Sequence, residues 1–164
     1  MEIDRLLHTA IKTSGVDLIL SVPCDMLKGL IREIENTKEI SYIPVTREEE
    51  GIGIATGAYL GGKTPLILMQ NSGLGNSINA IKSLLELYEI PIIFMMSHRG
   101  AEGEKIIAQF PMGKVTYDLL DCINMRKYII DTSVKISAVE DAVHFSRSSN
   151  KSVAIILKRT LWGG

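Results

Sequence analysis

REEEGIGIATGAYLGGKT, residues 47–64, ends in GAYLGGKT, which fits the nucleotide-binding pattern G-x-x-x-x-G-K-[ST]. A phosphate loop needs a strand before its glycines and a helix after them, so that amides at the helix N-terminus face the phosphate. Here the order is reversed, because the glycines close a helical pattern and Lys63 leads toward Pro65 and a strand-like run. We therefore interpret Gly61 and Gly62 as a helix C-cap, with Lys63 near the negative end of the helix.

The first half of the stretch predicts the head of a helix. Thr46 is suited to cap a helix that begins at Arg47, with Glu49 as the partner three residues later. Glycines recur inside this helix, although each costs about 1 kcal/mol relative to alanine; they are Gly51, Gly53 and Gly57. They indicate close approach by another helix, a subunit or a flat ligand. A carboxylate at the head of such a helix is a candidate acid–base group.

Strand-like and helical segments alternate on both sides of this stretch. The strand-like runs are mostly apolar, which is typical of parallel strands covered on both faces, and lie at 17–22, 40–45, 65–70, 90–97, 127–131 and 152–158. Helical patterns lie at about 2–13, 25–35, 48–61, 75–88, 113–121 and 136–149. The alternation predicts an α/β protein with a doubly wound, mainly parallel six-stranded sheet and helices on both faces. We expect residues 1–164 to form a single domain.

The composition limits the classes of function. The chain has 164 residues, 46% hydrophobic and 23% charged, as in an ordinary globular domain. Its formal net charge of -1 gives no support to a nucleic-acid or membrane surface. The charged N-terminus lacks the apolar core of a signal peptide, so we expect a cytoplasmic protein. Cys24 and Cys122 have no C-x-x-C spacing, so we expect neither a zinc site nor a dithiol centre in this chain.

Polar turns follow three of the predicted strands, where α/β sheets bind their ligands. MQNSGLGNSINAI (69–81) has the strand–turn–helix order needed for ligand contact, and an ordinary capped turn is the alternative. SHRG (97–100) is either part of a site or a solvated basic loop. The segment after it, AEGEKIIAQFPMGK (101–114), is long enough to cover a substrate. SVPCD (21–25) follows the first strand, and its proline restricts the turn.

Together these places resemble a known family. The matching runs are VPCDMLKGL (22–30), REEEGIGIATGAYLGGKTP (47–65), MQNSGLGNSINAI (69–81), HRG (98–100) and FPMGKVTYDLL (110–120). They resemble the pyrimidine-binding domain of thiamine-diphosphate-dependent decarboxylases, and within that family the sulfopyruvate decarboxylase alpha subunits and the matching half of phosphonopyruvate decarboxylases. The resemblance implies a carboxy-lyase that converts 3-sulfopyruvate to sulfoacetaldehyde and CO2, a step toward coenzyme M. Phosphonopyruvate or another 2-oxo acid is the alternative substrate.

The resemblance also implies a missing half of the active site. In this family a second domain binds Mg2+ and the cofactor's diphosphate through Gly-Asp-Gly and later asparagines, and this sequence has no Gly-Asp-Gly. The resemblance therefore implies a separate beta subunit that carries the diphosphate and Mg2+ site, with thiamine diphosphate at the interface. It implies a hetero-oligomer with two or more copies of each chain, active only when both subunits are present.

Individual residues acquire roles from the same resemblance. Counting nine residues back from Gly57 identifies Glu48 as the catalytic glutamate, which would hydrogen-bond N1′ of the aminopyrimidine ring and so promote loss of the thiazolium C2 proton. Glu49 and Glu50 are then surface or capping acids. The further residues expected to bind the cofactor are Pro23, Ser72, Gly73, Leu74, Gly75 and Asn76. A sulfonate needs cationic or amide donors, and the expected substrate-binding residues are Asn71, His98, Arg99 and Lys114.

Two alternatives belong to other classes of function. GAYLGGKT would suit a P-loop-like nucleotide-binding protein if Lys63 bound a phosphate. A non-catalytic interaction module would keep the fold of the pyrimidine domain without its chemistry. Glu48 favours the enzyme over this module.

Overall fold

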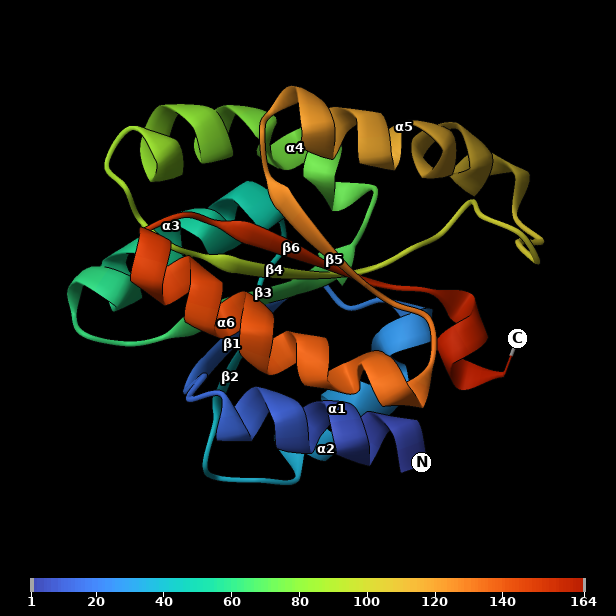
Figure 1. Cartoon of the computed structure of the whole chain (residues 1–164), viewed down its shortest axis with the longest axis horizontal. Coiled ribbons are helices and arrows are strands. Elements are labelled where there is room, and N and C mark those ends of the chain that lie inside the picture. Colours follow the sequence, from blue (N-terminus) through green and yellow to red (C-terminus); the bar gives the residue numbers. More distant parts are fainter. Residues whose placement is uncertain (1, 164) are drawn as a thin grey trace.

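Six parallel strands form one sheet in the computed structural model, which describes residues 2–163. The strands are β1 (Leu18–Ser21), β2 (Ser41–Pro44), β3 (Pro65–Gln70), β4 (Ile93–Ser97), β5 (Arg126–Ile130) and β6 (Val153–Leu157). Their order across the sheet is β2-β1-β3-β4-β6-β5, and every neighbouring pair is parallel. The predicted α/β class is confirmed, and the sheet is wholly parallel (Figure 1).

Helices cover both faces of the sheet (Figure 1). One face carries α1 (Glu2–Thr13), α2 (Lys28–Glu35) and α6 (Ala138–Ser149), and the other carries α3 (Glu48–Leu60), α4 (Gly73–Ala80) and α5 (Phe110–Cys122). Each face has its own apolar core, because successive side chains of a strand point to opposite faces. In β3, for example, Leu66 and Leu68 join one core, while Ile67 and Met69 join the other.

Shorter helical turns connect these elements. A π-helix, η2 (Ile81–Glu86), continues directly from α4. The 3-10 turns are η1 (Asp25–Leu27), η3 (Ile107–Gln109), η4 (Ser133–Ser137) and η5 (Arg159–Trp162). No helix within residues 2–163 is long and apolar enough to cross a membrane.

The direction of winding reverses between β1 and β3. The chain passes from β1 to β2 on one side and then returns to place β3 on the other side of β1. Where winding reverses in this way, the loops after the two adjacent strands separate and leave a crevice that commonly holds a ligand. The residues that follow β1 and β3, 22–24 and 71–72, therefore lie where this fold class binds ligands.

Several element boundaries differ from those predicted. The helix predicted at 75–88 begins earlier, at Gly73, because the Leu74 amide donates to the Asn71 carbonyl at 3.1 Å directly after β3. β4 begins only at Ile93, and Pro91, which lies before it, has no amide hydrogen to contribute to a ladder. The helix predicted at 113–121 begins at Phe110, since proline is well tolerated in a first helical turn. The helix predicted at 25–35 is divided into η1 and α2.

Candidate active site

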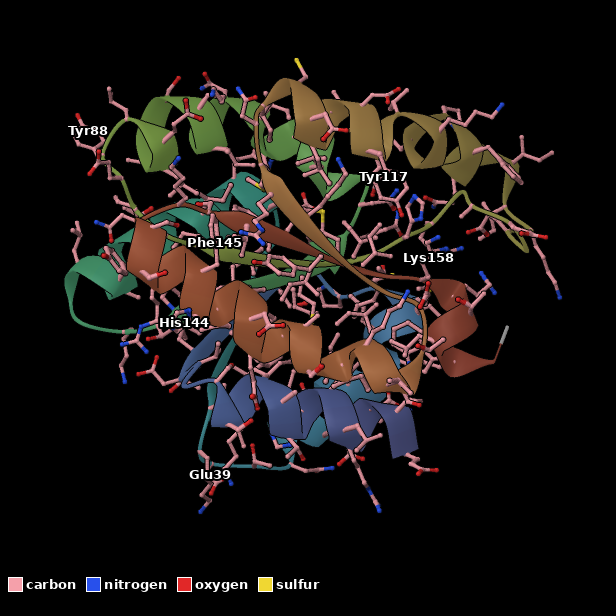
Figure 2. All side chains as sticks on the ribbon, viewed as in Figure 1. Glu39, Tyr88, Tyr117, His144, Phe145 and Lys158 are labelled. Carbon is pink, nitrogen blue, oxygen red and sulfur yellow. The ribbon has the colours of Figure 1, made fainter. Side chains whose placement is uncertain are left out.

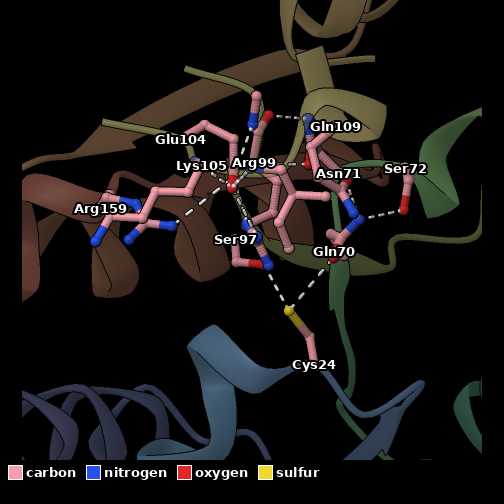
Figure 3. Close-up of polar contacts among 12 residues, drawn as sticks. Cys24, Gln70, Asn71, Ser72, Ser97, Arg99, Glu104, Lys105, Gln109 and Arg159 are labelled. Atoms are coloured by element: carbon pink, nitrogen blue, oxygen red, sulfur yellow. Dashed lines mark hydrogen bonds and ion pairs between the residues drawn. The ribbon is translucent and has the colours of Figure 1, made fainter. Parts of the chain in front are cut away.

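Polar side chains at or just after the ends of β1, β3 and β4 meet at the carboxyl edge of the sheet. Cys24 Sγ lies 3.6 Å from Gln70 Oε1 and 3.5 Å from Ser97 Oγ, so the ends of three strands are in contact (Figure 3). Figure 2 shows Lys158, which follows β6, on this side of the molecule and Tyr88 on the opposite side. The polar turns predicted from the sequence therefore lie close together.

Glu48 is a buried carboxylate at the head of α3. It is 8% exposed, and it lies against the start of α4: a Cβ atom added to Gly73 would stand 2.4 Å from Glu48 Oε1. Asn76 Nδ2 donates to Glu48 Oε2 at 3.4 Å, which is a long hydrogen bond. The structure thus brings Glu48, Gly73 and Asn76 together, as the cofactor hypothesis requires. Within residues 2–163, the carboxylate keeps most of its capacity to accept hydrogen bonds.

The neighbouring acids have local partners. The helix begins at Glu48 rather than at Arg47, and the predicted capping partner was wrong by one residue. Glu50 Oε2 accepts hydrogen bonds from the Thr46 amide at 3.0 Å and the Thr46 hydroxyl at 2.7 Å. Glu49 pairs with Arg47 at 2.5 Å. Glu49 is half-buried, and its Oε2 has no hydrogen-bond partner within residues 2–163. Of the three acids, Glu48 is the one that lies against α4.

Asn71 holds the loops after β3 and β4 together. It is fully buried, and its Nδ2 donates to the Arg99 carbonyl at 3.0 Å and to Thr116 Oγ1 at 2.8 Å. Its Oδ1 accepts from the Arg99 amide at 3.0 Å. These three bonds engage the side-chain amide within the chain. A positioning function fits this geometry, and direct substrate contact by Asn71 stays a prediction.

His98 is buried beneath the same edge. Its Nε2 lies 3.2 Å from the Gly113 carbonyl oxygen, so Nε2 carries the hydrogen of that bond. Burial lowers the pKa of the imidazole, which favours the neutral ring. In that form Nδ1 is an acceptor, and it is buried without a hydrogen-bond partner within residues 2–163. The ring packs at 5.0 Å between centroids against Tyr117.

Arg99 forms a buried ion pair with Glu104. Its Nε lies 2.6 Å from Glu104 Oε2 and its Nη2 2.9 Å from Oε1, and the two side chains are 9% and 2% exposed (Figure 3). The amides of Gly100, Lys105 and Ile106 also donate to this carboxylate. The guanidinium and these amides hold the pKa of Glu104 far below its ordinary value. The charge of Arg99 is thus neutralised within the chain.

The segment after β4 is packed against α5. A Cβ atom on Gly113 would lie 2.4 Å from the Gly100 carbonyl oxygen, so the two backbones cross closely. Gln70 Nε2 donates to Gln109 Oε1 and to Ser72 Oγ, both at 2.7 Å, which ties the segment to the turn after β3. Its apolar tip is exposed, since Ile107 is 84% exposed. That the segment covers a substrate stays a prediction.

The other predicted site residues differ in exposure. Pro23 is exposed in the loop after β1, and Gly75 is exposed in the first turn of α4. Leu74 is fully buried in the core on the α4 face. Lys114 is exposed on α5. Their proposed contacts with cofactor and substrate stay predictions.

GAYLGGKT is a helix end, as predicted. α3 ends at Leu60, Gly62 has the left-handed φ of 89°, and the Lys63 amide returns to the Ala58 carbonyl at 3.0 Å. Lys63 Nζ lies 3.4 Å from Asp17 Oδ2. A strand, β3, follows this turn, whereas a phosphate loop is followed by a helix. The phosphate-loop interpretation is therefore wrong.

Sequence reasoning missed Gln70, Glu104 and Gln109. Gln70 could have been identified from the sequence, because it is a polar residue at the carboxyl end of an otherwise apolar strand, where this fold class binds ligands. Glu104 and Gln109 lie in a segment that shows neither helical nor strand-like periodicity. Their partners are Arg99, just after the end of β4, and Gln70, the last residue of β3. Nothing in the sequence pattern identified either contact.

The comparison with known families adds an independent observation. The profile described as "Thiamine pyrophosphate enzyme, N-terminal TPP binding domain" matches residues 1–125, most of the chain. The chain belongs to the thiamine pyrophosphate enzymes. The family predicted from the sequence motifs is confirmed.

Relatives within this thiamine pyrophosphate family include both decarboxylase types that the motifs suggested. The sulfopyruvate decarboxylase subunit alpha of Methanococcus maripaludis is 47% identical over 163 residues, covering 99% of this chain and 98% of that protein. A phosphonopyruvate decarboxylase of Streptomyces viridochromogenes is 40% identical over 117 residues, covering 71% of this chain but 30% of that longer protein. The chain thus matches the first relative over almost its whole length.

A solved structure shows the same fold at low sequence identity. The 2-oxoglutarate:ferredoxin oxidoreductase from Magnetococcus marinus superposes with a TM-score of 0.74 at 13% identity. The match covers 96% of this chain and 29% of the oxidoreductase chain. At this identity the likeness supports the fold alone.

The residues present fit the pyrimidine end of the family cofactor. Glu48 has unused acceptor capacity in a buried position, and Gly73 has no side chain where a larger residue would collide with it. On the outer side of α3, Cβ atoms at Gly53 and Gly57 would meet nothing within 4 Å. Among residues 2–163, no three His, Cys, Asp or Glu side chains gather in a way that could hold a metal ion.

Proposed function

We propose that this chain is the alpha subunit of a two-subunit, thiamine-diphosphate-dependent decarboxylase that converts 3-sulfopyruvate to sulfoacetaldehyde and CO2. The observation that carries the proposal is Glu48, a buried carboxylate with one long hydrogen bond that faces a glycine. The 47% identity to a sulfopyruvate decarboxylase subunit alpha, over nearly the whole of both chains, supports the choice of substrate.

The chain's own residues would hold and polarise the pyrimidine. Bound thiamine diphosphate supplies an acidic thiazolium carbon and a cationic ring that accepts the electron pair released with CO2. Glu48 would share a proton with N1′ of the aminopyrimidine, through a charge-assisted bond that is stronger in a partly dry site than in water. Gly73 has no side chain, which lets the Glu48 side chain pack directly against the start of α4 in this position. The other residues proposed to flank the ring are Pro23, Ser72, Leu74, Gly75 and Asn76.

The substrate's sulfonate requires donors from this edge. We keep Asn71, His98, Arg99 and Lys114 as the proposed group, and the geometry divides them. Lys114 is exposed and has no ion-pair partner within residues 2–163, whereas Arg99 is neutralised by Glu104. Lys114 is therefore the available positive charge among the four, and Asn71 acts by holding the Arg99 loop in place.

The proposed partner is a beta subunit that binds Mg2+ and the diphosphate. The sequence has no Gly-Asp-Gly, and the phosphonopyruvate decarboxylase relative extends well beyond the part that this chain matches. The outer side of α3 offers an interface of small and apolar residues, with Leu60 73% and Ile54 39% exposed beside bare glycines. We propose a hetero-oligomer with two or more copies of each chain.

Phosphonopyruvate is the second candidate substrate. The 40% identity to a phosphonopyruvate decarboxylase over 71% of this chain favours it. Both substrates are anionic 2-oxo acids, so the same edge could accept either. The ratio of kcat/KM for the two substrates decides between them.

The test is aldehyde formation by the assembled enzyme. This chain would be combined with a candidate subunit that carries the diphosphate motif, thiamine diphosphate and Mg2+, and supplied with sulfopyruvate or phosphonopyruvate. Sulfoacetaldehyde release that requires both chains supports the proposal. An assembled, cofactor-loaded complex that releases no sulfoacetaldehyde but turns over another 2-oxo acid would reject sulfopyruvate and keep the decarboxylase.

A further inference from the structure

A cleft lies at the end of the sheet opposite the candidate active site. Its volume is about 350 Å3, within the lower range of small-molecule sites. The lining residues come from η2, the end of α5, the end of α6 and the turns that lead into β4, β5 and β6; they are Ile81, Leu85, Glu86, Glu89, Ile123, Asn124, Met125, Ser149, Asn150, Lys151 and Ser152. Tyr88, adjacent in sequence to Glu89, marks this side of the molecule in Figure 2.

Three helices end at this cleft with the same geometry. After η2, α5 and α6, the chain passes through a left-handed residue, and the next amide bonds back to a carbonyl of the helix: Ile90 to Leu85 at 2.8 Å, Met125 to Leu120 at 2.9 Å and Lys151 to Ser146 at 3.2 Å. Each helix C-terminus carries a partial negative charge from its aligned peptide dipoles. Three such ends therefore make one negative rim.

The backbone around the cleft is unusual for its residue types. Glu89, Asn124 and Asn150 have φ values of 54°, 55° and 53°, and they are the non-glycine residues with positive φ within residues 2–163. Asparagine is tolerated in this conformation, but glutamate is strained there and glycine would be the favourable choice. η2, which also lines the cleft, is a π-helix, a rare form that is frequent at functional sites.

The side chains provide an apolar floor beneath a charged rim. Ile81, Leu85, Ile123 and Met125 are all at least 93% buried and form the floor. Two carboxylates and one ammonium lie on the rim. The Glu86 carboxylate is paired with Lys82, whereas the Glu89 carboxylate is exposed and has no hydrogen-bond or ion-pair partner within residues 2–163.

We propose that this cleft binds a small organic cation, namely a protonated amine on a short apolar chain. The apolar chain would lie on the floor, and the ammonium would meet the free Glu89 carboxylate and the negative helix ends. An anion is disfavoured by the same three helix ends, although Lys151 lies on the rim. The strained glutamate at position 89 is then explained, because glycine would relieve the backbone but remove the carboxylate.

The test uses probes that share an apolar chain and differ in charge. n-Butylammonium chloride, 1-butanol and sodium butyrate would be titrated into the full chain at constant ionic strength while its backbone amide NMR signals are recorded. Butylammonium should give saturable shifts at residues 85–90, 123–125 and 149–152, with a dissociation constant on the order of millimolar for so small a ligand. Butanol should bind at least about fivefold more weakly, and butyrate more weakly still.

Two variants of Glu89 separate binding from folding. Glu89→Gln should weaken butylammonium binding by about fivefold, while Glu102→Gln, which removes an exposed charge elsewhere, should leave it unchanged. Glu89→Gly should weaken binding as well, yet raise the melting temperature by relieving the left-handed backbone. Equal shifts with all three probes, or unchanged butylammonium affinity in both Glu89 variants, would overturn the proposal. Neither readout depends on decarboxylase activity.

Discussion

Glu48 and Glu104 are two buried carboxylates at the same edge of the sheet, and their surroundings are opposite. Glu104 accepts two bonds from Arg99 and further bonds from three backbone amides. Glu48 accepts one long bond from Asn76 and otherwise faces a glycine. A buried carboxylate whose acceptor sites are filled holds the fold together, whereas one with vacant acceptor sites is costly unless something outside the chain completes it. The difference separates a structural acid from a functional one.

Glu48→Gln is the variant from which we expect the largest loss of turnover. The variant keeps the shape of the side chain but removes the charge proposed to stabilise the proton at N1′, so turnover in the assembled complex should fall by about 10²–10⁴. The free energy of unfolding should change by less than about 1 kcal/mol, because the amide oxygen still accepts from Asn76. Aldehyde release and urea unfolding measure the two effects.

Glu50→Gln is the matched control for this variant. It removes the same charge two residues further along α3, where the carboxylate accepts hydrogen bonds from the amide and hydroxyl of Thr46. We expect turnover within about threefold of wild type, since Glu50 is exposed and engaged locally. Turnover above a tenth of wild type in Glu48→Gln would show that the wrong glutamate had been chosen.

Glu104→Gln should show the reverse pattern, with its largest effect on stability. It leaves the buried Arg99 guanidinium without a counter-charge, which should cost about 3 kcal/mol of unfolding free energy. Glu102→Gln removes an exposed acid from the same segment and should cost less than about 0.5 kcal/mol. Urea unfolding of the isolated chain compares them. Equal stabilities of the two variants would mean that the ion pair does not hold the segment.

The pH dependence of stability should distinguish the structural acid as well. The pKa of Glu104 in the folded chain lies far below its ordinary value of 4.5. Its ionised form therefore contributes stability above that value, and the contribution is lost as the pH falls below 4.5 toward the folded-state pKa. The difference in unfolding free energy between wild type and Glu104→Gln should be largest near about pH 6–7 and shrink toward about pH 3. A difference that stays constant with pH would contradict this linkage.

The contrast between Glu48 and Glu104 also shows which parts of the fold and of the site can be predicted from the sequence. The positions of the strands and helices along the chain depend on local periodicity, and the end of α3 depends on the turn chemistry of Gly62, so both were predictable, whereas the order of the strands across the sheet was not predicted. Glu48 was selected through the family resemblance, by counting back from Gly57 in the motif that carries it, and its catalytic role stays a prediction. The capping partner was missed because α3 begins one residue later than expected, which moves the role from Glu49 to Glu50. The Arg99–Glu104 pair depends on how an aperiodic segment folds back, which no pattern records.

Gly73→Ala tests the space beside Glu48 without removing the carboxylate. The new Cβ would meet the Glu48 side chain at 2.4 Å, so that side chain or α4 must move. Because small misplacements of reacting groups cost large factors in rate, we expect turnover to fall by about 10–100-fold, less than in Glu48→Gln. If the apparent KM for thiamine diphosphate rises together with this fall in turnover, the clash lies in the cofactor site. Gly53→Ala, on the open side of α3, is the control for isolated-chain stability.

The smallest expected effect concerns the hydrogen bond between Thr46 and Glu50 beside the start of α3. Thr46→Ala removes the hydroxyl that donates to Glu50 Oε2 at 2.7 Å, while the Thr46 amide still donates to the same oxygen, so it should cost about 1 kcal/mol of unfolding free energy or less, as for one net hydrogen bond. If Glu48 is held mainly by its packing against Gly73, turnover should stay within about threefold of wild type. A loss of turnover as large as that of Gly73→Ala, with a small change in stability, would show that the Thr46–Glu50 hydrogen bond helps to orient the Glu48 carboxylate. Thr46 would then be a positioning residue for the functional carboxylate of Glu48.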